Sequence, residues 1–551
     1  MNRTVWGALA PGRKDGSYLL NPAKLLISFG ANLGCAASSS AKSTGGGGMK
    51  WFRILGFLLT LAICQGVEAQ TATVNWTTTY QTMDGWGAED WFGNGSVNGS
   101  EGSGFTLTSS QAATFFSPTT GIGLEYIRTG NYACPITGAC AVSTTLVPDL
   151  VTLQEAVANG ALVDVNVQPP ANLKYVGNFV ESTPDPATGI CVDSSKWSAF
   201  ASYTVQWIQM LQSNGVPVSV LSVSNEPDQN TGDSLGGCVW TAAGLDGYIG
   251  GTLGPALSSA GLSSVKVMLP ENSSWFDTDL VSTCLNDPTC SRYVGNAAGH
   301  GYGVGGTDGT DNGYCCHTAT APPASTAGKH VWMTEVNGGP NYDSSTANWI
   351  FDPSMTDALV WAHSIHDYLT VANASAWFYW ELVDWCGGAT DGGCAGAPFN
   401  SGLTVSTGGG ETPSGLITSA RMYVVGNWSK FVRTGWVRIG ATANPVTGVF
   451  VTAFNQTSSG GFAIVAINSS NSNTTVTFSL SGFPRSPSSV TPWTTSSTLN
   501  LAQQSAVSVS DASFTYTLPA SSVTSFVGNT TTGPVPPTPP APPTQLMESV
   551  Q

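Results

Sequence analysis

Short apolar runs alternate with helical stretches between residue 83 and about residue 431, and this alternation leaves few folds open to the chain. Each run is rich in β-branched residues, which is typical of a strand buried on both faces. Eight such runs with helices between them predict a (β/α)8 TIM barrel of the α/β class. An open doubly wound sheet is the alternative, but no Gly-rich phosphate loop follows any run. The predicted strands are Gly85–Ala88, Leu124–Arg128, Leu162–Val167, Val218–Ser224, Val265–Leu269, Tyr293–Ala297, Val331–Thr334 and Ala376–Trp380, and the clearest helices are Trp197–Gln212, Ala242–Ser259 and Ser345–Leu369.

From about residue 432 the apolar residues recur with period two, as in Phe450–Phe454 and Phe462–Ile467. This pattern, with frequent Ser/Thr turns, predicts an antiparallel β-sandwich over residues 432–529, attached to a barrel over residues 83–431. Residues 70–82 have the same character, and we expect them to add a strand to the sandwich. Residues 530–551 are predicted to be a Pro-rich tail.

Near the N-terminus, the basic segment Met49–Arg53 is followed by the apolar run Ile54–Ile63 and a small-residue cleavage pattern that ends at Ala69. This order predicts a secretory signal peptide at residues 49–69, too short to span a bilayer. A lipoprotein signal ending at Cys64 is the alternative. We therefore expect a secreted protein, extracellular or periplasmic, and we expect residues 1–48 to be a non-structural extension.

Cysteine usage agrees with export, because the ten cysteines after the predicted signal peptide are an even number that suggests disulfides. Zinc is the competing interpretation, but the spacing differs from C-x2-C and no nearby histidines complete a tetrahedral set. Cys315 and Cys316 are adjacent, so their pairing stays open. The predicted close pairs are Cys134/Cys140, Cys284/Cys290 and Cys386/Cys394, with Cys191/Cys238 as a fourth.

The chain is acidic and has few charges, with 18 Lys and Arg against 34 Asp and Glu, so that 9% of its residues are charged. Ordinary globular proteins have about 25%. An acidic surface disfavours nucleic acid as a partner. A chain rich in Trp, Tyr, Ser, Thr and Asn suits a neutral carbohydrate, and we expect no cofactor, no metal, no membrane span and a monomer.

Two glutamates each follow a predicted strand directly. Glu226 lies in the motif Ser-Asn-Glu-Pro after the fourth strand, and Glu335 lies in Met-Thr-Glu-Val-Asn after the seventh. The carboxyl ends of barrel strands form the active-site face. Two glutamates on that face can cleave a glycosidic bond, since one carboxylic acid protonates the leaving oxygen and the other attacks the sugar carbon or activates water.

These motifs resemble glycoside hydrolase family 30, whose barrel enzymes retain the anomeric configuration and include glucosylceramidase-, xylanase- and β-1,6-glucanase-like members. The resemblance covers residues 72–528. It is carried by Met83–Gly87, Gly123–Arg128, Gln168–Lys174, Ser224–Pro227, His300–Gly303, Thr334–Glu335, Trp377–Trp380 and Trp428–Gly435.

The resemblance implies that Glu226 is the acid/base, that Glu335 is the nucleophile and that Asn225 binds the sugar 2-hydroxyl. Arg128 and Tyr302 would hold the Glu335 carboxylate. Structural ion pairs or core aromatics are the alternatives for these supporting residues. We expect further site residues of three kinds: an apolar wall at Trp380, an orienting or core histidine at His300, and subsite platforms, or else core residues, at Trp86 and Trp275.

Two departures from the family pattern bear on substrate. Val167-Gln168-Pro169-Pro170 replaces an aromatic found after the third strand in many relatives, and the chain lacks the Arg-Arg-Ser-Tyr-Gly signature of glucuronoxylan-specific members. We therefore expect a retaining β-glycoside hydrolase acting on a neutral glycan: β-1,6- or β-1,4-linked glucan, galactan or xylan. A glucosylceramidase-like exo-enzyme and a non-catalytic carbohydrate-binding protein are the alternatives.

Overall fold

The chain divides into two compact units, residues 1–67 and 68–551, and the computed structural model describes parts of the second. The predicted extension, signal peptide and Pro-rich tail lie outside the described residues. In the part that is described, no helix has the length and apolar character needed to cross a membrane. The described residues are 70–90, 105–131, 139–147, 149–170, 172–174, 192–228, 238–274, 278–302, 326, 328–338, 342–343, 348–349, 351–385, 402–407 and 414–530.

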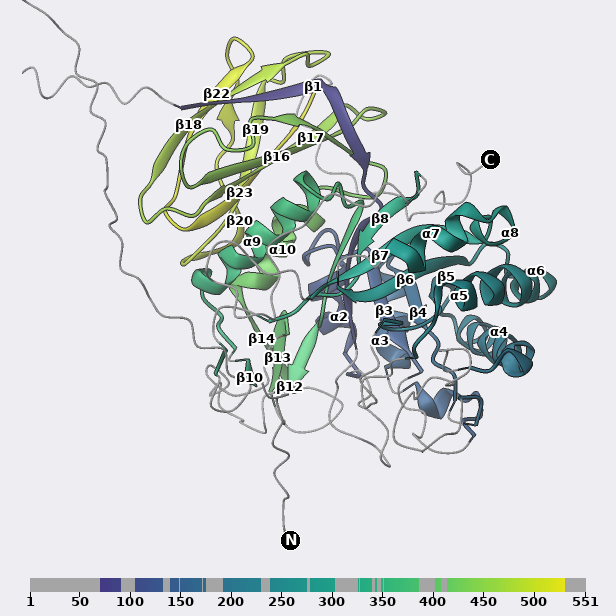
Figure 1. Ribbon diagram of the computed structural model, residues 1–551. Helices are drawn as coiled ribbons and strands as arrows, with labels where there is room; N and C mark the ends of the chain where they lie inside the picture. Colours follow the sequence, from purple (N-terminus) through teal and green to yellow (C-terminus); the bar gives the residue numbers. More distant parts are fainter. Residues whose placement is uncertain are drawn as a thin grey trace, which may run out of the picture. The chain divides into compact units, whose positions relative to one another are not determined.

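Eight strands close into a parallel barrel in the order β11-β2-β3-β4-β5-β6-β7-β8, which confirms the predicted fold class (Figure 1). Each predicted strand is present, displaced by a few residues at most at its start. The barrel strands are β2 (Gly85–Glu89), β3 (Tyr126–Gly130), β4 (Leu162–Asn166), β5 (Val218–Ser222), β6 (Lys266–Ser274), β7 (Val294–Tyr302), β8 (His330–Met333) and β11 (Ala376–Tyr379).

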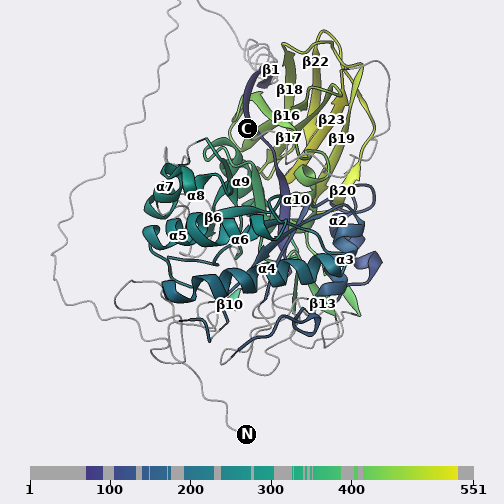
Figure 2. The ribbon, with the colours of Figure 1, turned by 90° about the vertical axis from the view of Figure 1, so that its right-hand side faces the viewer.

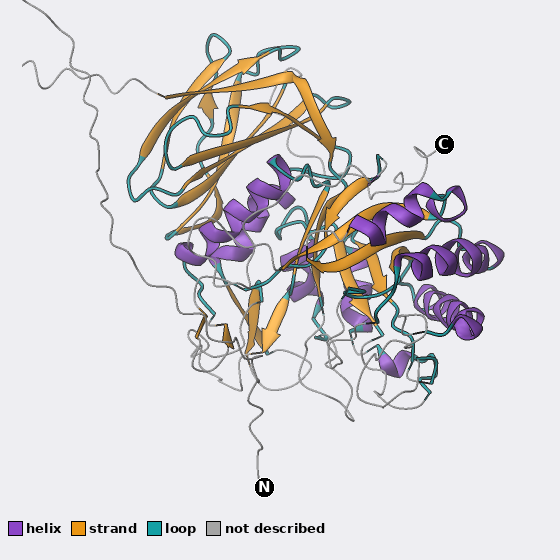
Figure 3. Cartoon of the chain, viewed as in Figure 1, coloured by secondary structure: helices purple, strands orange, loops and turns teal. Residues whose placement is uncertain are grey.

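Among the described residues, helices follow β2, β3, β4, β5, β6, β8 and β11 and lie outside the barrel (Figures 2 and 3). The predicted helix Ala242–Ser259 is interrupted by a π-helical turn at Ile249–Leu253. The predicted helix Ser345–Leu369 begins later than expected, because Ser354 caps its first turn by accepting a hydrogen bond from the Thr356 amide. The α-helices are α2 (Ser109–Phe116), α3 (Leu150–Ala158), α4 (Trp197–Ser213), α5 (Ala242–Tyr248), α6 (Gly254–Ser259), α7 (Thr278–Asn286), α8 (Pro288–Ser291), α9 (Met355–Thr370) and α10 (Ala420–Ser429), with 3-10 turns at Thr144–Leu146 and Ser194–Lys196.

The barrel interior is built in layers, because side chains two residues apart on a strand point to the same side. One layer is apolar and buried: Tyr126, Val220, Met268, Ala298, Trp332, Ala376 and Phe378, with the partly buried Leu162 packed against it. Gly87 leaves room for it, since a Cβ there would lie 2.8 Å from the Phe378 ring. Two residues further along the same strands, toward their carboxyl ends, the interior positions become polar, as at Arg128, Asp164, Ser222 and His300.

The C-terminal part is a ten-stranded sheet around its own apolar core, as expected for a sandwich-like side domain. The N-terminal strand β1 (Gln70–Thr82) lies within this sheet and pairs with β18 in parallel, whereas the other pairs in the sheet are antiparallel. The remaining strands are β15 (Val437–Ala441), β16 (Val449–Gln456), β17 (Gly461–Asn468), β18 (Thr474–Ser481), β19 (Ser489–Ser496), β20 (Leu499–Gln503), β21 (Val507–Ser508), β22 (Ser513–Leu518) and β23 (Ser522–Asn529).

Strand β17 is buried on both faces, because Phe462 and Ile464 face the sheet's core while Ala463 and Val465 belong to the core shared with the barrel. Helix α10 also bonds to the sheet, since the Trp428 indole N–H donates to Thr452 Oγ1. Two smaller sheets complete the described part: β9 (Tyr342–Asp343) with β10 (Asn348–Trp349), and β12 (Val383–Trp385) with β13 (Thr404–Thr407) and β14 (Gly415–Thr418).

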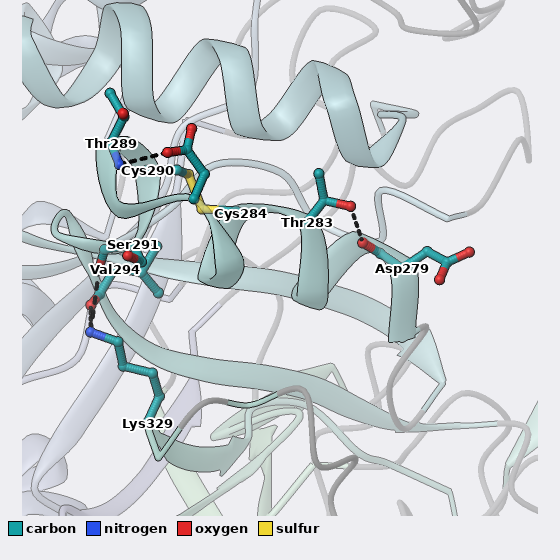
Figure 4. The surroundings of a disulfide bond; sticks show 9 residues. Asp279, Thr283, Cys284, Thr289, Cys290, Ser291, Val294 and Lys329 are labelled. Atoms are coloured by element: carbon teal, nitrogen blue, oxygen red, sulfur yellow. Dashed lines mark hydrogen bonds between the residues drawn. A yellow bond between two sulfur atoms is a disulfide. The ribbon is translucent and has the colours of Figure 1, made fainter.

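One predicted disulfide, Cys284–Cys290, is confirmed (Figure 4). It joins the end of α7 to α8, with the two Cα atoms 5.2 Å apart. Cys140 and Cys238 are also disulfide-bonded. Their predicted partners, Cys134 and Cys191, lie outside the described residues, as do Cys315, Cys316, Cys386 and Cys394.

Candidate active site

Polar side chains from neighbouring barrel strands meet at the carboxyl ends of those strands. Side chains two residues apart on a strand point to the same side, so the residues that follow the apolar layer also point into the barrel. Residues that are distant in sequence therefore become neighbours there. The group comprises Glu89 at the end of β2, Arg128 on β3, Asn225 and Glu226 after β5, Glu271 on β6, His300 and Tyr302 on β7, and Glu335 after β8.

Arg128 is the centre of this group and is fully buried. Its Nη1 contacts Glu89 Oε2 and lies 2.7 Å from Glu335 Oε2, and its Nη2 donates to Asn225 Oδ1 at 2.7 Å. Its Nε lies 3.2 Å from Glu271 Oε1. The planar guanidinium thus holds three carboxylates and one amide in fixed directions.

His300 is also fully buried and lies among three carboxylates. Its Nδ1 is 3.2 Å from Glu226 Oε1 and 3.7 Å from Glu335 Oε1, while its Nε2 is 3.6 Å from Glu271 Oε1. Burial alone would lower the pKa of His300, but these three carboxylates raise it to about 10. The ring is therefore an imidazolium at neutral pH.

Two of the glutamates reach solvent. The side chain of Glu226 is 14% exposed and that of Glu335 is 7% exposed, whereas those of Glu89 and Glu271 are 1% and 0% exposed. One carboxylate oxygen of Glu226 lies within 4.8 Å of one of Glu335. A substrate at the barrel mouth can therefore touch Glu226 and Glu335 but not the two glutamates beneath them.

Tyr302 fixes the second oxygen of Glu335, since its hydroxyl donates to Glu335 Oε1 at 3.0 Å. Burial, followed by the charges of Glu335 and Glu226, raises the pKa of Tyr302 well above its usual range. The hydroxyl therefore stays a donor, and Glu335 receives hydrogen bonds from Tyr302 on one oxygen and from Arg128 on the other.

The two buried glutamates differ in ionisation. Burial raises the pKa of Glu89 well above its usual range, and the charges of Glu335 and Glu271 add to the effect against the attraction of Arg128. Burial acts on Glu271 too, but Arg128, His300 and the Ser222 hydroxyl outweigh it and lower the pKa of Glu271 to about 2. Glu271 is thus the permanent anion, and Glu89 takes up a proton more readily.

The three predicted tryptophans of the site lie in different places. Trp380 follows β11 directly and is partly exposed, and its amide donates to the Val336 carbonyl, which places it beside the segment that carries Glu335. Trp86 does not fit a stacking platform: its side chain is fully buried in the core and its indole N–H donates to the Val432 carbonyl. Residue 86 has the opposite parity to Gly87 and Glu89, which face the barrel interior. Trp275 lies outside the described residues.

Glu89 and Glu271 were missed by the sequence analysis, although a signal exists. Each follows a short apolar run at the carboxyl end of a barrel strand, as in Gly-Trp-Gly-Ala-Glu and Val-Met-Leu-Pro-Glu. The rule that selected Glu226 and Glu335 would have selected both, had it been applied to every predicted strand.

Two groups of side chains among the described residues have the spacing of metal ligands. In one of them, Glu226, His300 and Glu335 each place a ligand atom within 4.8 Å of the others. Asp246 lies near Cys284 and Cys290, whose sulfurs are in a disulfide and supply no thiolate.

A closed (β/α)8 barrel with a sandwich-like side domain and two solvent-reaching glutamates at its carboxyl face defines a glycoside hydrolase. The family model "Glycosyl hydrolase family 30 TIM-barrel domain" matches residues 171–372, which lie within the barrel part of the chain.

Relatives agree with this assignment. The chain is 29% identical over 380 residues to glucuronoxylanase XynC of Bacillus subtilis (strain 168), a match that covers 69% of this chain and 76% of that protein. Among solved structures, it is similar to a family 30 subfamily 8 xylanase from Clostridium acetobutylicum, with 25% identity and a TM-score of 0.63 over 84% of this chain and 100% of that one. A family 30 endoxylanase from Clostridium papyrosolvens C71 has 26% identity and a TM-score of 0.61, over 83% of this chain and 100% of that one.

Proposed function

We propose that the protein is a secreted β-glycoside hydrolase that cleaves a neutral β-linked glycan by a retaining double displacement, with a xylan backbone as the first candidate. The observation that supports the mechanism is that one carboxylate oxygen of Glu226 lies within 4.8 Å of one of Glu335, which brings the two carboxyl groups close together. Inverting enzymes need about 6.5–9.5 Å between their carboxyl groups to admit a water, whereas retaining enzymes place them about 5–5.5 Å apart. A glucosylceramidase-like exo-action is the alternative.

In the first step, Glu226 is the acid and Glu335 the nucleophile. A Glu335 oxygen forms a bond to the anomeric carbon while the bond from that carbon to the leaving oxygen breaks, and the proton of Glu226 goes to the leaving oxygen. Arg128 Nη1, 2.7 Å from Glu335 Oε2, holds the carboxylate in place for this attack. Asn225 turns its Oδ1 toward Arg128, which leaves its amide N–H groups to donate to a sugar hydroxyl.

In the second step, the Glu226 carboxylate takes a proton from water as the water oxygen bonds to the anomeric carbon. The bond between that carbon and Glu335 breaks, which restores the Glu335 carboxylate and the protonated Glu226. Two inversions leave the anomeric configuration unchanged. Tyr302 and Arg128 remain in place to receive the returning charge on Glu335.

The positions of the cations support a neutral substrate. Seven of the 18 Lys and Arg residues precede residue 70, and no Lys or Arg lies between Lys329 and Arg421, a stretch that includes the whole segment after β11. Near the carboxyl ends of the strands, Arg128 is committed to the buried carboxylates, and the Lys196 ammonium donates to the Asn172 and Lys174 carbonyls. Recognition of a uronate would need a cation aimed at its carboxylate.

Secretion is part of the proposal and rests on the signal-like segment at residues 49–69. The Cys284–Cys290 disulfide supports it, because disulfides persist in oxidising compartments. N-terminal sequencing of the protein recovered from culture medium would test it, with Gln70 as the expected first residue.

Hydrolysis of beechwood glucuronoxylan, before and after enzymatic removal of its glucuronate groups, tests the substrate proposal. We expect the full chain to retain at least about a third of its rate after removal, with Glu335→Gln as the inactive control. A loss of tenfold or more would show that uronate is required. Proton NMR of the first-formed reducing end tests the mechanism, and an initial α-anomer from the β-linked chain would refute double displacement.

A further inference from the structure

Glu271 contacts both buried cations of the candidate site, Arg128 and His300, although its own side chain is not exposed to solvent. Its side chain is fully buried. Its Oε1 lies 3.2 Å from Arg128 Nε and 3.6 Å from His300 Nε2, and its Oε2 accepts hydrogen bonds from Ser222 Oγ and Arg128 Nη2. Its backbone carbonyl accepts a 3.0 Å hydrogen bond from the Glu226 amide.

His300 needs such a partner because the charges beside it move during the proposed reaction. The first step of the proposed mechanism uses Glu335 as the carboxylate nucleophile and Glu226 as the acid. In the glycosyl-enzyme Glu335 is an uncharged ester and Glu226 is the anion. The imidazole Nδ1 lies 3.2 Å from one and 3.7 Å from the other, so it faces the negative charge in both states.

During the transfer itself, neither Glu226 nor Glu335 carries a full charge. A buried cation without a full counter-charge is unstable, and it would tend to lose its proton. The charged and titratable groups that face His300 in the described structure are Glu226, Glu271, Tyr302 and Glu335, with Arg128 and Glu89 beyond them.

We propose that Glu271 is a positioning residue that supplies a constant counter-charge to His300, so that the imidazolium persists while negative charge passes from Glu335 to Glu226. This inference rests on the proposed function. Ser222 and Arg128 hold the Glu271 carboxylate on its other side, which fixes the direction in which it meets the ring.

Nitrogen NMR of the imidazole groups, with isotope-labelled histidine, tests the inference directly. The chain has five histidines, and a His300→Gln sample assigns the signal. In the full-length wild type we expect His300 to stay protonated up to about pH 9. In Glu271→Gln, which keeps the shape but loses the charge, its pKa should fall by about 1–3 units, the effect of one opposite charge at this range.

Glu125→Gln is the matched control, because Glu125 is also buried and pairs with an arginine, Arg433, at 3.3 Å, but does not contact His300. The pKa of His300 should be unchanged in this variant. Equal pKa values for His300 in wild type and Glu271→Gln would overturn the inference.

A second measurement uses wild type alone, which matters if Glu271→Gln does not fold. A 2-fluoro xylobioside with an activated leaving group should trap the Glu335 ester, and His300 should remain protonated in the trapped protein at pH 7. A neutral imidazole there, or in the free enzyme, would overturn the inference.

Kinetics separates the positioning role from simple loss of folded protein. In Glu271→Gln we expect kcat to fall about 10–100-fold with KM within about threefold, and the basic limb of the kcat profile to move to lower pH. An unshifted profile would contradict the inference. Failure of the inhibitor to label Glu335, seen by mass spectrometry, would instead contradict the proposed function, because the free-enzyme NMR comparison does not depend on turnover.

Discussion

The backbone amide of Glu226 donates a 3.0 Å hydrogen bond to the backbone carbonyl of Glu271. Both residues have positive φ, 48° and 64°, a conformation that side-chain-bearing residues adopt infrequently. The segment after β5 is thus held by the neighbouring strand β6, and the candidate acid takes its position from two strands at once. Unusual backbone conformations of this kind concentrate at functional sites.

Substitution of Glu226 and Glu335, the two glutamates that reach solvent, should give different defects. Glu335→Gln should lower kcat by at least about 10⁴-fold on every substrate, because no carboxylate remains to form the ester. Glu226→Gln should lose about 10²–10⁴-fold on polysaccharide but much less on an aryl glycoside with a good leaving group, and added azide should restore turnover. Equal losses without azide rescue would contradict the assignment of roles.

Removal of the Tyr302 hydroxyl should slow chemistry with little effect on binding. Tyr302→Phe removes a 3.0 Å hydrogen bond to Glu335 Oε1, and a bond to a charged group contributes about 1.5–3 kcal/mol. We expect kcat to fall about 10–100-fold with KM nearly unchanged. Tyr423→Phe, which removes a hydroxyl that bonds to Thr418 away from the site, is the control. An unchanged kcat in Tyr302→Phe would argue against a role for this bond.

The protein should lose stability as the pH rises from about 7 to 9.5. The pKa of His300 is about 10 in the folded state and about 6.5 when unfolded, so its stabilising effect is complete below pH 6.5 and disappears on approach to pH 10. The free energy of unfolding, measured by urea denaturation at several pH values in this range, should fall less steeply with pH in His300→Gln than in the wild type. His366→Gln is the control, because the pKa of His366 is lowered to about 4 and its titration lies below this window. Equal slopes in His300→Gln and wild type would refute the prediction.

Two tryptophan substitutions should separate packing from substrate binding. Trp86→Phe leaves a void in the core and removes the hydrogen bond to Val432, so it should lower the free energy of unfolding by about 1–3 kcal/mol while kcat/KM of the folded protein stays within about twofold. Trp380→Phe should instead lower kcat/KM on xylan and leave the free energy of unfolding nearly unchanged. Urea denaturation and xylan kinetics on both variants would distinguish the two roles. A large loss of substrate affinity in Trp86→Phe would show that Trp86 binds substrate.

The sequence predicted the eight barrel strands well, because a strand buried on both faces reads as a continuous apolar run. It left Trp86 open between a subsite platform and a core residue, because the face of a strand on which a residue lies depends on parity, and the packing of Gly87 against Phe378 is what fixes the parity of β2. Of the buried ionic cluster it anticipated Arg128 as a partner of Glu335. Glu89 and Glu271 carry the same signal as Glu226 and Glu335, a glutamate at the carboxyl end of a barrel strand, but their contacts with Arg128 depend on closure of the barrel and could not be predicted from the sequence.

Helix boundaries were also less predictable than strand positions. The residues before α9 have helical periodicity, yet Asn348 and Trp349 form a strand and the helix begins after Ser354. Local propensity is a weak guide where tertiary pairing competes with it.

The apolar layer beneath Arg128 and His300 has a consequence for proton traffic. Tyr126, Trp332 and Phe378 fill the barrel just below the ionic cluster, with the Tyr126 ring centroid 5.1 Å from that of Trp332 and 5.3 Å from that of Phe378. Protons therefore exchange between this cluster and bulk water at the mouth, where the side chains of Glu226 and Glu335 reach solvent. Once a sugar chain covers that mouth, the number of protons on the cluster is fixed, and a catalytic cycle can only redistribute them until product leaves or water enters.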